Sequence, residues 1–190
     1  MSVPYDPEYV NPVAVKSMGI DPAWGSSAFG IVVTQFVDGK VQVLYAEEFE
    51  RPDYNEMLKK TLELICKYDP TKIWIDGANP SFIRSLKINI GGNEEVEYEQ
   101  AISRYKQMKV DYGQNMKVIP VNFSSEHKSM LGHTKMLLED GLISIDSGFD
   151  KLITSLRTAV DNEGKLDKEA TSYDDIFDAF RLSLHIYQFS

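Results

Sequence analysis

The sequence predicts an α/β fold in which a mixed β-sheet, with three antiparallel strands followed by parallel ones, is flanked by α-helices. Three apolar runs of the β type come first, before any helical pattern. Helical and strand patterns then alternate to the C-terminus, as in proteins whose helices pack on a partly parallel sheet. The 190 residues, 43% of them hydrophobic, can bury one substantial core. We expect a single domain over residues 18–190, after a linker or leading arm, residues 1–17, that contains three prolines and little periodicity.

The first three strands are predicted by apolar runs and one turn. The first run ends at Asp21, and the next two cover residues 29–36 and 41–49. Between the second and third runs lies Asp38-Gly39, a dipeptide typical of the two-residue turns that close β-hairpins. These strands should therefore pair in antiparallel order.

A helix and a fourth strand follow. Asp53 and Glu56 are typical of a helix start, and apolar residues then recur at helical spacing until Asp69-Pro70 ends the pattern. The lone cysteine, Cys66, lies in this pattern, so we expect a buried structural thiol rather than a nucleophile. Residues 72–76 are predicted to form a short buried strand, and a short helix should follow around Phe82, Ile83 and Leu86.

The second half of the chain contains an insertion and four further elements. Residues 91–113 are polar and rich in Glu and Tyr, and we interpret them as an inserted loop with a helix over about 94–109. We then expect a strand over 117–123, a helix from after Ser124-Ser125 to Gly141, a strand over 142–145 and a helix carrying Leu152, Ile153, Leu156 and Val160. Residues 161–171 lack periodicity and should form a loop, and the last helix should start near Asp174.

Carboxylates stand where three of these elements could bring them together. Asp21 and Asp76 end apolar strands, and Asp174, Asp175 and Asp178 lie in the first turns of the last helix. Hard oxygen ligands suit Mg²⁺ or Mn²⁺, and two such ions held by shared carboxylates can support phosphodiester cleavage. Taken singly, each of these residues also fits a turn or a helix cap. Their combination favours a metal site.

Charge and composition narrow the class of protein. The net charge of −9 is unfavourable for tight autonomous binding to DNA, because phosphate contacts usually come from Lys and Arg. Bound cations or a basic partner could supply the positive charge that DNA binding needs. No apolar run reaches membrane-spanning length and no signal peptide precedes the first strand, so we expect an intracellular protein without membrane contact.

The order of elements resembles that of the ribonuclease H-like fold and, more closely, the nuclease domain of the large terminase subunit of tailed viruses. The segment Gly19-Ile20-Asp21-Pro22-Ala23-Trp24-Gly25 is similar to the first motif of that family, and Ile75-Asp76-Gly77 to the second. The third motif resembles residues 172–180, in which Tyr173 stands where many relatives have His. The pattern of residues 127–160 is also similar. The resemblance covers residues 17–190.

This resemblance implies roles for individual residues. Asp21 would bridge two metal ions, Asp76 would bind one and Asp178 the other. Asp175 lies one helical turn before Asp178 and would face the same site. Asp174 is expected to be a cap or an outer residue, because it points about 100° away from Asp175 on an ideal helix. Candidates for contacts to DNA phosphates are Lys128, Lys135 and Arg84, although each also fits an ordinary solvated cation.

The function implied is a metal-dependent endonuclease, with two Mg²⁺ or Mn²⁺ ions, that cuts concatemeric viral DNA during genome packaging. The expected partners are double-stranded DNA, an ATPase motor domain, the portal and the small terminase subunit, in the cytoplasm of the infected host cell. The sequence has no Gly-x-x-x-x-Gly-Lys-Ser/Thr loop, so the motor is not expected in this chain.

Two alternatives remain at this point. Asp21 and the hairpin after it also resemble the first phosphate loop of actin-like ATPases and sugar kinases, although two such subdomains would hardly fit in 190 residues. The other alternative is a non-catalytic module of the same fold that binds DNA or a protein partner.

Overall fold

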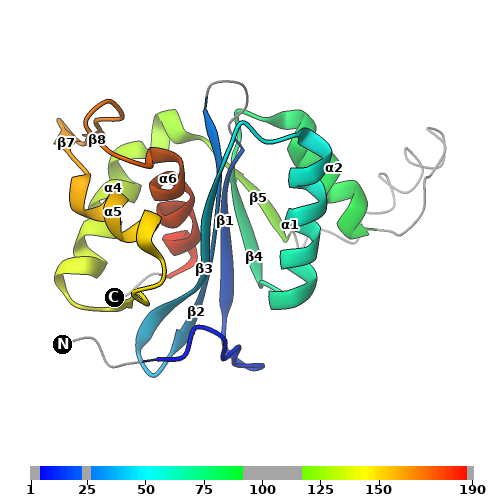
Figure 1. Cartoon of the computed structure of the whole chain (residues 1–190), viewed down its shortest axis with the longest axis horizontal. Helices are drawn as coiled ribbons and strands as arrows, with labels where there is room; N and C mark the ends of the chain where they lie inside the picture. The colour runs from blue at the N-terminus through cyan, green and yellow to red at the C-terminus, as the bar shows by residue number, and fades with distance from the viewer. Residues whose placement is uncertain (1–4, 23–26, 92–116, 188–190) are drawn as a thin grey trace.

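A six-stranded mixed sheet forms the middle layer of the protein (Figure 1). A computed structural model describes residues 5–22, 27–91 and 117–187. The strand order is β5-β4-β1-β2-β3-β6. The first three strands pair antiparallel, and β4, β5 and β6 join them in parallel, as predicted. Their bounds are β1 Lys16–Pro22, β2 Ala28–Val37, β3 Lys40–Glu50, β4 Lys72–Asp76, β5 Val118–Val121 and β6 Ile143–Ser144.

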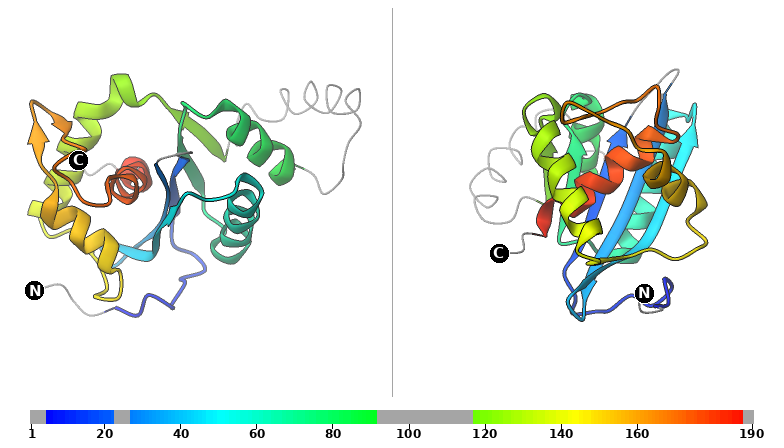
Figure 2. Two further views of the ribbon diagram at one scale, coloured as in Figure 1. Left: turned by 45° about the horizontal axis from the view of Figure 1, so that its top comes forward. Right: turned by 90° about the vertical axis from the view of Figure 1, so that its left-hand side faces the viewer.

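Helices cover both faces of this sheet. One face carries α1 (Tyr54–Tyr68) and α2 (Pro80–Gly91), and the other carries α4 (Phe123–Glu139), α5 (Asp150–Thr158) and α6 (Asp174–Ser183), as Figures 1 and 2 show. A 3₁₀ turn, η1 (Leu184–Ile186), follows α6. Each helical layer encloses its own part of the hydrophobic core against the sheet. None of the helices in the described ranges has the length and apolar character needed to cross a membrane.

Local sequence signals explain the β2–β3 hairpin and α1. Asp38 and Gly39 both have positive φ angles, 52° and 75°, which is the backbone of the predicted hairpin turn. The Asp53 carboxylate accepts hydrogen bonds from the backbone N–H groups of Asn55 and Glu56 and so caps α1. The helix ends at Asp69, whose φ is 44°. These boundaries match the prediction.

Two glycines allow α6 to lie directly on the sheet. A Cβ atom on Gly19 of β1 would stand 1.9 Å from the carbonyl oxygen of Ala179. One on Gly30 of β2 would stand 2.4 Å from the carbonyl oxygen of Asp175. Only glycine accommodates a helix backbone at this distance. The two contacts together hold α6 against β1 and β2 from Asp175 to Ser183.

The start of α6 is capped from another element. Tyr173 is the N-cap and has a left-handed backbone with no side-chain cap hydrogen bond. Instead, Oε2 of Glu48 on β3 accepts a hydrogen bond of 3.0 Å from the Ile176 N–H. The expectation that Asp174 caps the helix was therefore wrong, since Asp174 is its first helical residue.

Three other local predictions need correction. The fifth strand ends at Val121 and α4 begins at Phe123, because the Asn122 side chain caps the Ser124 N–H. Cys66 is exposed, because the buried stripe of α1 runs through other positions. Val160 lies beyond the end of α5 and is exposed.

The predicted loop over residues 161–171 contains a small hairpin of β7 (Asp161–Asn162) and β8 (Lys165–Leu166). Its turn is closed by the Asp161 carboxylate, which accepts a hydrogen bond from the N–H of Gly164. The hairpin is too short to produce a period in the sequence. The predicted helix over 94–109 lies outside the described residues.

The described part of the leading segment runs along the domain through specific hydrogen bonds. The Tyr5 hydroxyl donates to the Val43 carbonyl at 2.7 Å and accepts from the Asp146 N–H at 2.9 Å. The Asn11 N–H donates to the side-chain oxygen of Gln35. Residues 5–15 are therefore connected to β2, β3 and the segment before α5.

Candidate active site

The sheet brings the first two predicted carboxylates together. β1 and β4 are adjacent and parallel, with Ile20 opposite Ile75, so the residues that follow, Asp21 and Asp76, are neighbours at one edge of the sheet. Asp21 is only 6% exposed, and Asp76 is half-buried. The carboxyl ends of parallel strands in an α/β protein are the usual place for a binding site.

The helix α6 adds two more carboxylates at this edge. Asp175 and Asp178 are both buried, with Asp178 only 2% exposed. Oδ2 of Asp175 accepts a hydrogen bond of 3.0 Å from the N–H of Ala28 at the start of β2. We refer to Asp21, Asp76, Asp175 and Asp178 as the acidic cluster.

When the carboxylates of the acidic cluster are all ionised, their negative charges repel one another. Burial raises the pKa of Asp21 well above its usual value, and repulsion by Asp178 and then Asp175 raises it further. Burial is also the main cause of the raised pKa values of Asp76 and Asp175. Carboxylates in this situation are stabilised by a cation or a proton.

Two side-chain cations contact Asp178, one at each oxygen. Nζ of Lys168, from the segment between β8 and α6, lies 2.9 Å from Oδ2 and also 3.4 Å from an oxygen of Asp174. Nη2 of Arg181, one turn further along α6, lies 2.7 Å from Oδ1. Burial opposes the charge on Lys168, but Asp178 outweighs burial and raises the lysine pKa.

Arg181 is enclosed by the protein. Its side chain is 0% exposed, and its guanidinium carbon lies 4.7 Å from the centroid of the Phe123 ring. A guanidinium stacks well on an aromatic face in such a place. The contact with Asp178 is an ion pair without hydrogen-bond alignment, because neither Oδ1 nor Nη2 has a hydrogen-bond partner among the described residues. Oδ1 is thus neutralised by the guanidinium charge rather than by a directed hydrogen bond.

Glu48 extends the negative region toward β3. Burial raises its pKa to about 6, although the hydrogen bond from Ile176 acts in the opposite direction. Its charge is also close enough to Asp175 for the two to repel. Glu48 therefore accepts a hydrogen bond from the start of α6 and also adds a negative charge near the acidic cluster.

Only some of the predicted site residues lie in the acidic cluster. It brings Asp21, Asp76, Asp175 and Asp178 to one edge, and Asp174 joins them through Lys168. The predicted DNA-contacting cations are all exposed. Lys128 and Lys135 lie on α4, where the Lys128 side chain runs beside Gly164 of the β7–β8 turn and Lys135 is 3.8 Å from Glu139, and Arg84 lies on α2 at the opposite face of the sheet.

Sequence reasoning missed Lys168, Arg181 and Glu48. Arg181 follows Asp178 at helical spacing i,i+3, a signal for an ion pair that could have been used. Lys168 lies in a segment without periodicity, and Glu48 lies in a strand far away in the sequence. For these two residues, only the fold shows the partners.

The donor chemistry of the acidic cluster fits a hard divalent cation. Its donors are carboxylate oxygens, and burial together with mutual repulsion leaves Asp21 in need of a compensating positive charge. As the side chains stand, however, no three Asp, Glu, His or Cys residues in the described ranges are grouped closely enough to hold a metal ion. The ammonium of Lys168 lies on Asp178 instead.

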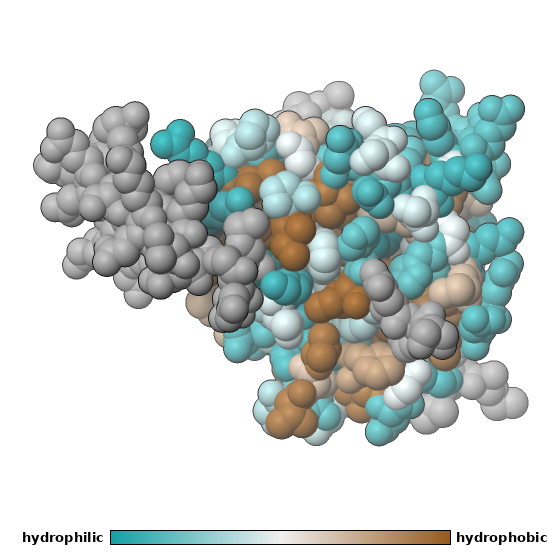
Figure 3. Space-filling model, turned by 180° about the vertical axis from the view of Figure 1, so that it is seen from behind, coloured by the Kyte–Doolittle hydropathy of each residue, from teal (hydrophilic) through white to brown (hydrophobic). Residues whose placement is uncertain are grey.

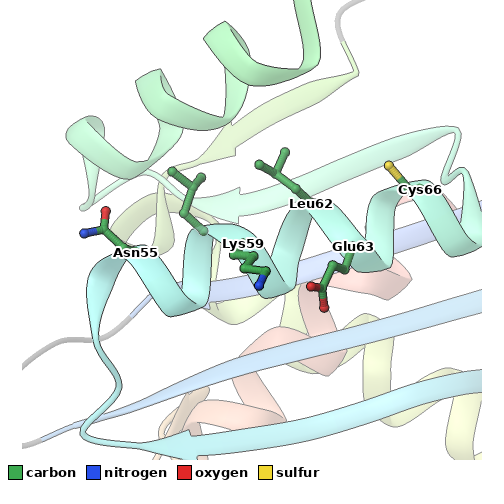
Figure 4. A pocket seen from close by; sticks show the side chains of 6 residues that line it. Asn55, Lys59, Leu62, Glu63 and Cys66 are labelled. Atoms are coloured by element: carbon green, nitrogen blue, oxygen red, sulfur yellow. The ribbon is translucent and has the colours of Figure 1, made fainter. Parts of the chain in front are cut away.

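Other surface features of the described residues do not contain these carboxylates. A hollow of about 550 Å³ is lined by residues of α1, among them Leu62 and Cys66, which point to the same side of the helix (Figure 4). On the face opposite that of Figure 1, hydrophobic side chains form small patches separated by polar ones (Figure 3). Neither feature supplies ionisable groups comparable to the acidic cluster.

A mixed sheet with carboxylates at the ends of its first and fourth strands, and a late helix that adds more, defines a protein of the ribonuclease H-like fold. Residues 18–186 match the family described as the terminase RNaseH-like domain. The chain belongs to this family. The match assigns the chain to terminases rather than to actin-like ATPases or sugar kinases. No curated protein matches the sequence.

Solved structures share the fold at low identity. The large terminase nuclease from thermophilic phage G20c superposes with a TM-score of 0.66 at 14% identity, over 99% of this chain and 94% of that one. The nuclease domain of g2p from bacteriophage SPP1, solved with bound Mn, gives 0.57 at 12% identity over 90% and 85%.

The large terminase of thermophilic bacteriophage D6E gives a TM-score of 0.64 at 15% identity over 95% of this chain. This chain covers 42% of the D6E protein. The structural likeness therefore concerns one part of that longer protein.

Proposed function

We propose that this domain is a metal-dependent endonuclease that cuts concatemeric viral DNA during genome packaging. The observation that carries the proposal is the acidic cluster, in which four buried or half-buried carboxylates from β1, β4 and α6 meet at one edge of the sheet. Membership of the terminase family supports it. Related nucleases have been crystallised with Mn in SPP1 and with magnesium or cobalt in G20c.

In this proposal, Asp21, Asp76 and Asp178 would hold the two Mg²⁺ or Mn²⁺ ions, and Asp175 would support the site. Such ions, when bound, supply an activated water and stabilise the leaving oxygen. The chain itself orients the ligands. The Ala28 N–H holds Asp175 by a hydrogen bond, and Arg181 holds one side of Asp178.

The proposed partners follow from charge and from the relatives. With a net charge of −9, the domain should bind double-stranded DNA weakly and in a salt-dependent manner on its own. We propose that an ATPase motor domain, together with the portal and the small terminase subunit, holds the DNA during packaging in the cytoplasm of the infected cell. That this chain covers 42% of the D6E large terminase supports a further domain in the working protein.

The direct test is cleavage of supercoiled plasmid with Mn²⁺, with Mg²⁺ and with chelator. Nicked and linear DNA should form only with metal. Asp21→Asn, Asp76→Asn and Asp178→Asn should each abolish cleavage, because the amide keeps the shape but loses the charge that a hard cation requires. Asp175→Asn should have a milder effect. Asp140→Asn, at an exposed position at the end of α4, is the matched control and should cut normally.

Cleavage that persists in chelator, or in all three variants, would contradict the proposal. DNA binding that is independent of metal and occurs without any cutting would favour a non-catalytic module. We also expect little sequence preference, because phosphate contacts carry no base information. Cutting at a single short sequence in several unrelated plasmids would count against this expectation.

A further inference from the structure

The ammonium of Lys168 lies within the acidic cluster, in contact with one oxygen of Asp178. It lies 2.9 Å from Oδ2 of Asp178 and 3.4 Å from Oδ2 of Asp174. Its charge also acts on Asp21, Asp76 and Asp175. One ammonium group thus faces carboxylates from three different elements.

We propose that Lys168 is a displaceable internal cation, which occupies the Oδ2 side of Asp178 in the metal-free domain and must leave before a divalent ion binds there. This inference rests on the proposed function, because it takes the acidic cluster to be a metal site. It predicts that Lys168 lowers the affinity for metal and that metal releases the lysine.

The two cations at Asp178 differ in their freedom to move. The Arg181 side chain is 0% exposed and is packed on Phe123, so its movement would open the core. The Lys168 side chain is 51% exposed and belongs to the segment between β8 and α6. Asp178 itself is buried, so this is not a surface ion pair, but the lysine end can pass into solvent without opening the core. Arg181 is therefore the fixed cation and Lys168 the movable one.

The structure also offers a place for the displaced lysine. A hollow of about 580 Å³ is lined by residues of β7, β8 and the following segment, and Lys168 is one of them. Its lining includes three acidic residues, Glu163, Asp167 and Glu169, and one further basic residue, Lys165. A lysine that turned away from Asp178 would meet solvent there beside an excess of acidic residues, so its release is not opposed by burial of an unpaired charge.

Binding of Mn²⁺ by calorimetry tests the inference in two variants. Lys168→Met removes the ammonium, and Lys165→Met removes the same formal charge from an exposed position on β8. If the lysine leaves the site vacant about a tenth of the time, its removal should raise the Mn²⁺ affinity about tenfold. Lys165→Met should change the affinity far less. Equal affinities for wild type and Lys168→Met would overturn the inference.

A second measurement uses the wild-type protein, so it does not depend on how a variant folds. The rate at which an amine-reactive acetylating reagent modifies Lys168 is followed by mass spectrometry, with and without Mn²⁺. Release of the ammonium from Asp178 should increase the labelling of Lys168 several-fold, while Lys165 in the same experiment stays unchanged. Unchanged or reduced labelling of Lys168 at saturating Mn²⁺ would overturn the inference.

These readouts separate this inference from the nuclease proposal. A higher Mn²⁺ affinity of Lys168→Met without plasmid cleavage by any form would support the displaceable lysine and contradict the nuclease. Normal metal-dependent cleavage with no effect of Lys168→Met on the Mn²⁺ affinity would support the nuclease and contradict the displaceable lysine. Absence of Mn²⁺ binding in both proteins would overturn both.

Discussion

Among single residues, Asp178 has the most constrained surroundings. Both of its oxygens contact cations, Lys168 on one side and the buried Arg181 on the other. From the carboxylates alone, one would expect Asp178→Asn to relieve repulsion and stabilise the metal-free protein. The structure reverses this expectation, because the substitution leaves a buried guanidinium without its anion.

We therefore predict that Asp178→Asn lowers the melting temperature of the metal-free protein by several degrees. Loss of one partner of a buried pair costs about 3–5 kcal/mol, and each kcal/mol corresponds to about 2–4 °C in a domain of this size. The gain in melting temperature on adding Mn²⁺ should also shrink. Thermal melts across a Mn²⁺ titration, with Asp140→Asn as control, measure both effects. A metal-induced shift equal to that of wild type would remove Asp178 from the ligands.

Arg181 should be as important for stability as its partner. Arg181→Met leaves Asp178 buried beside one exposed lysine, and we expect a loss of about 3 kcal/mol in the free energy of unfolding by urea. Arg181→Lys should not restore it, because an ammonium cannot stack on Phe123 as a guanidinium does. The control is Arg157→Met, at an exposed position on α5, which should change the free energy by at most about 0.5 kcal/mol. Equal stability of Arg181→Met and wild type would show that the ion pair contributes nothing net.

At the scale of elements, the approach of α6 to β1 places the carboxylates of the helix beside those of the strands. This approach depends on Gly19, where a Cβ would stand 1.9 Å from the Ala179 carbonyl oxygen and 2.5 Å from the Ser183 nitrogen. Both are backbone atoms of α6, so no side-chain rotation can relieve the clash. The helix must shift as a whole, and the acidic cluster with it.

Gly19→Ala should therefore destabilise the protein by more than about 2 kcal/mol and reduce Mn²⁺ binding, although it adds only a methyl group. The matched control is Gly132→Ala on α4, where an added Cβ meets nothing within 4 Å. This change should be neutral or stabilise by up to about 1 kcal/mol, since alanine favours a helix. Urea unfolding of both variants measures the difference. A tolerated Gly19→Ala would mean that α6 can move away from the sheet without cost.

For the whole molecule, the raised pKa values make stability depend on pH. The folded-state pKa values of Asp21, Asp76, Asp175 and Glu48 all lie above their ordinary values. The folded protein thus binds protons more tightly than the unfolded chain. Stability from these groups is fully present below the unfolded pKa values and is lost as the pH rises through the folded ones.

Without metal, the urea midpoint should accordingly rise as the pH falls from 7 to about 5, a window that includes the pKa of about 6 for Glu48. In Glu48→Gln, part of this pH dependence should disappear, because that group no longer titrates. With saturating Mn²⁺ the trend should weaken or reverse, since protons then compete with the metal for the same oxygens. Burial lowers the pKa values of His127 and His185, and these groups act in the opposite direction over this range. The comparison with Glu48→Gln is therefore decisive, and an identical pH dependence in the two proteins would show that Glu48 does not contribute.

Much of the fold and the identity of the main carboxylates could be predicted from the sequence. Apolar runs of the β type, the Asp38-Gly39 turn and the cap at Asp53 depend on neighbouring residues, and these signals located the first strands and α1 correctly. Asp21 and Asp76 could be singled out because each ends a recognisable strand. Such features depend only on residues close together in the chain, so they can be recognised in the sequence.

The tertiary structure alone decided what surrounds these carboxylates. Glu48 caps α6 across 128 positions of sequence, and Ala28 binds Asp175 across 147. Lys168 comes from a segment without a local pattern, so its contact with Asp178 is seen only in the folded protein. The electrostatic interactions in a buried site depend on distances in the folded protein. These distances cannot be read from the residues next to each charge in the sequence. The sequence by itself therefore determined which groups could bind a metal, and the packing of α6 on the sheet decided which cations they meet first.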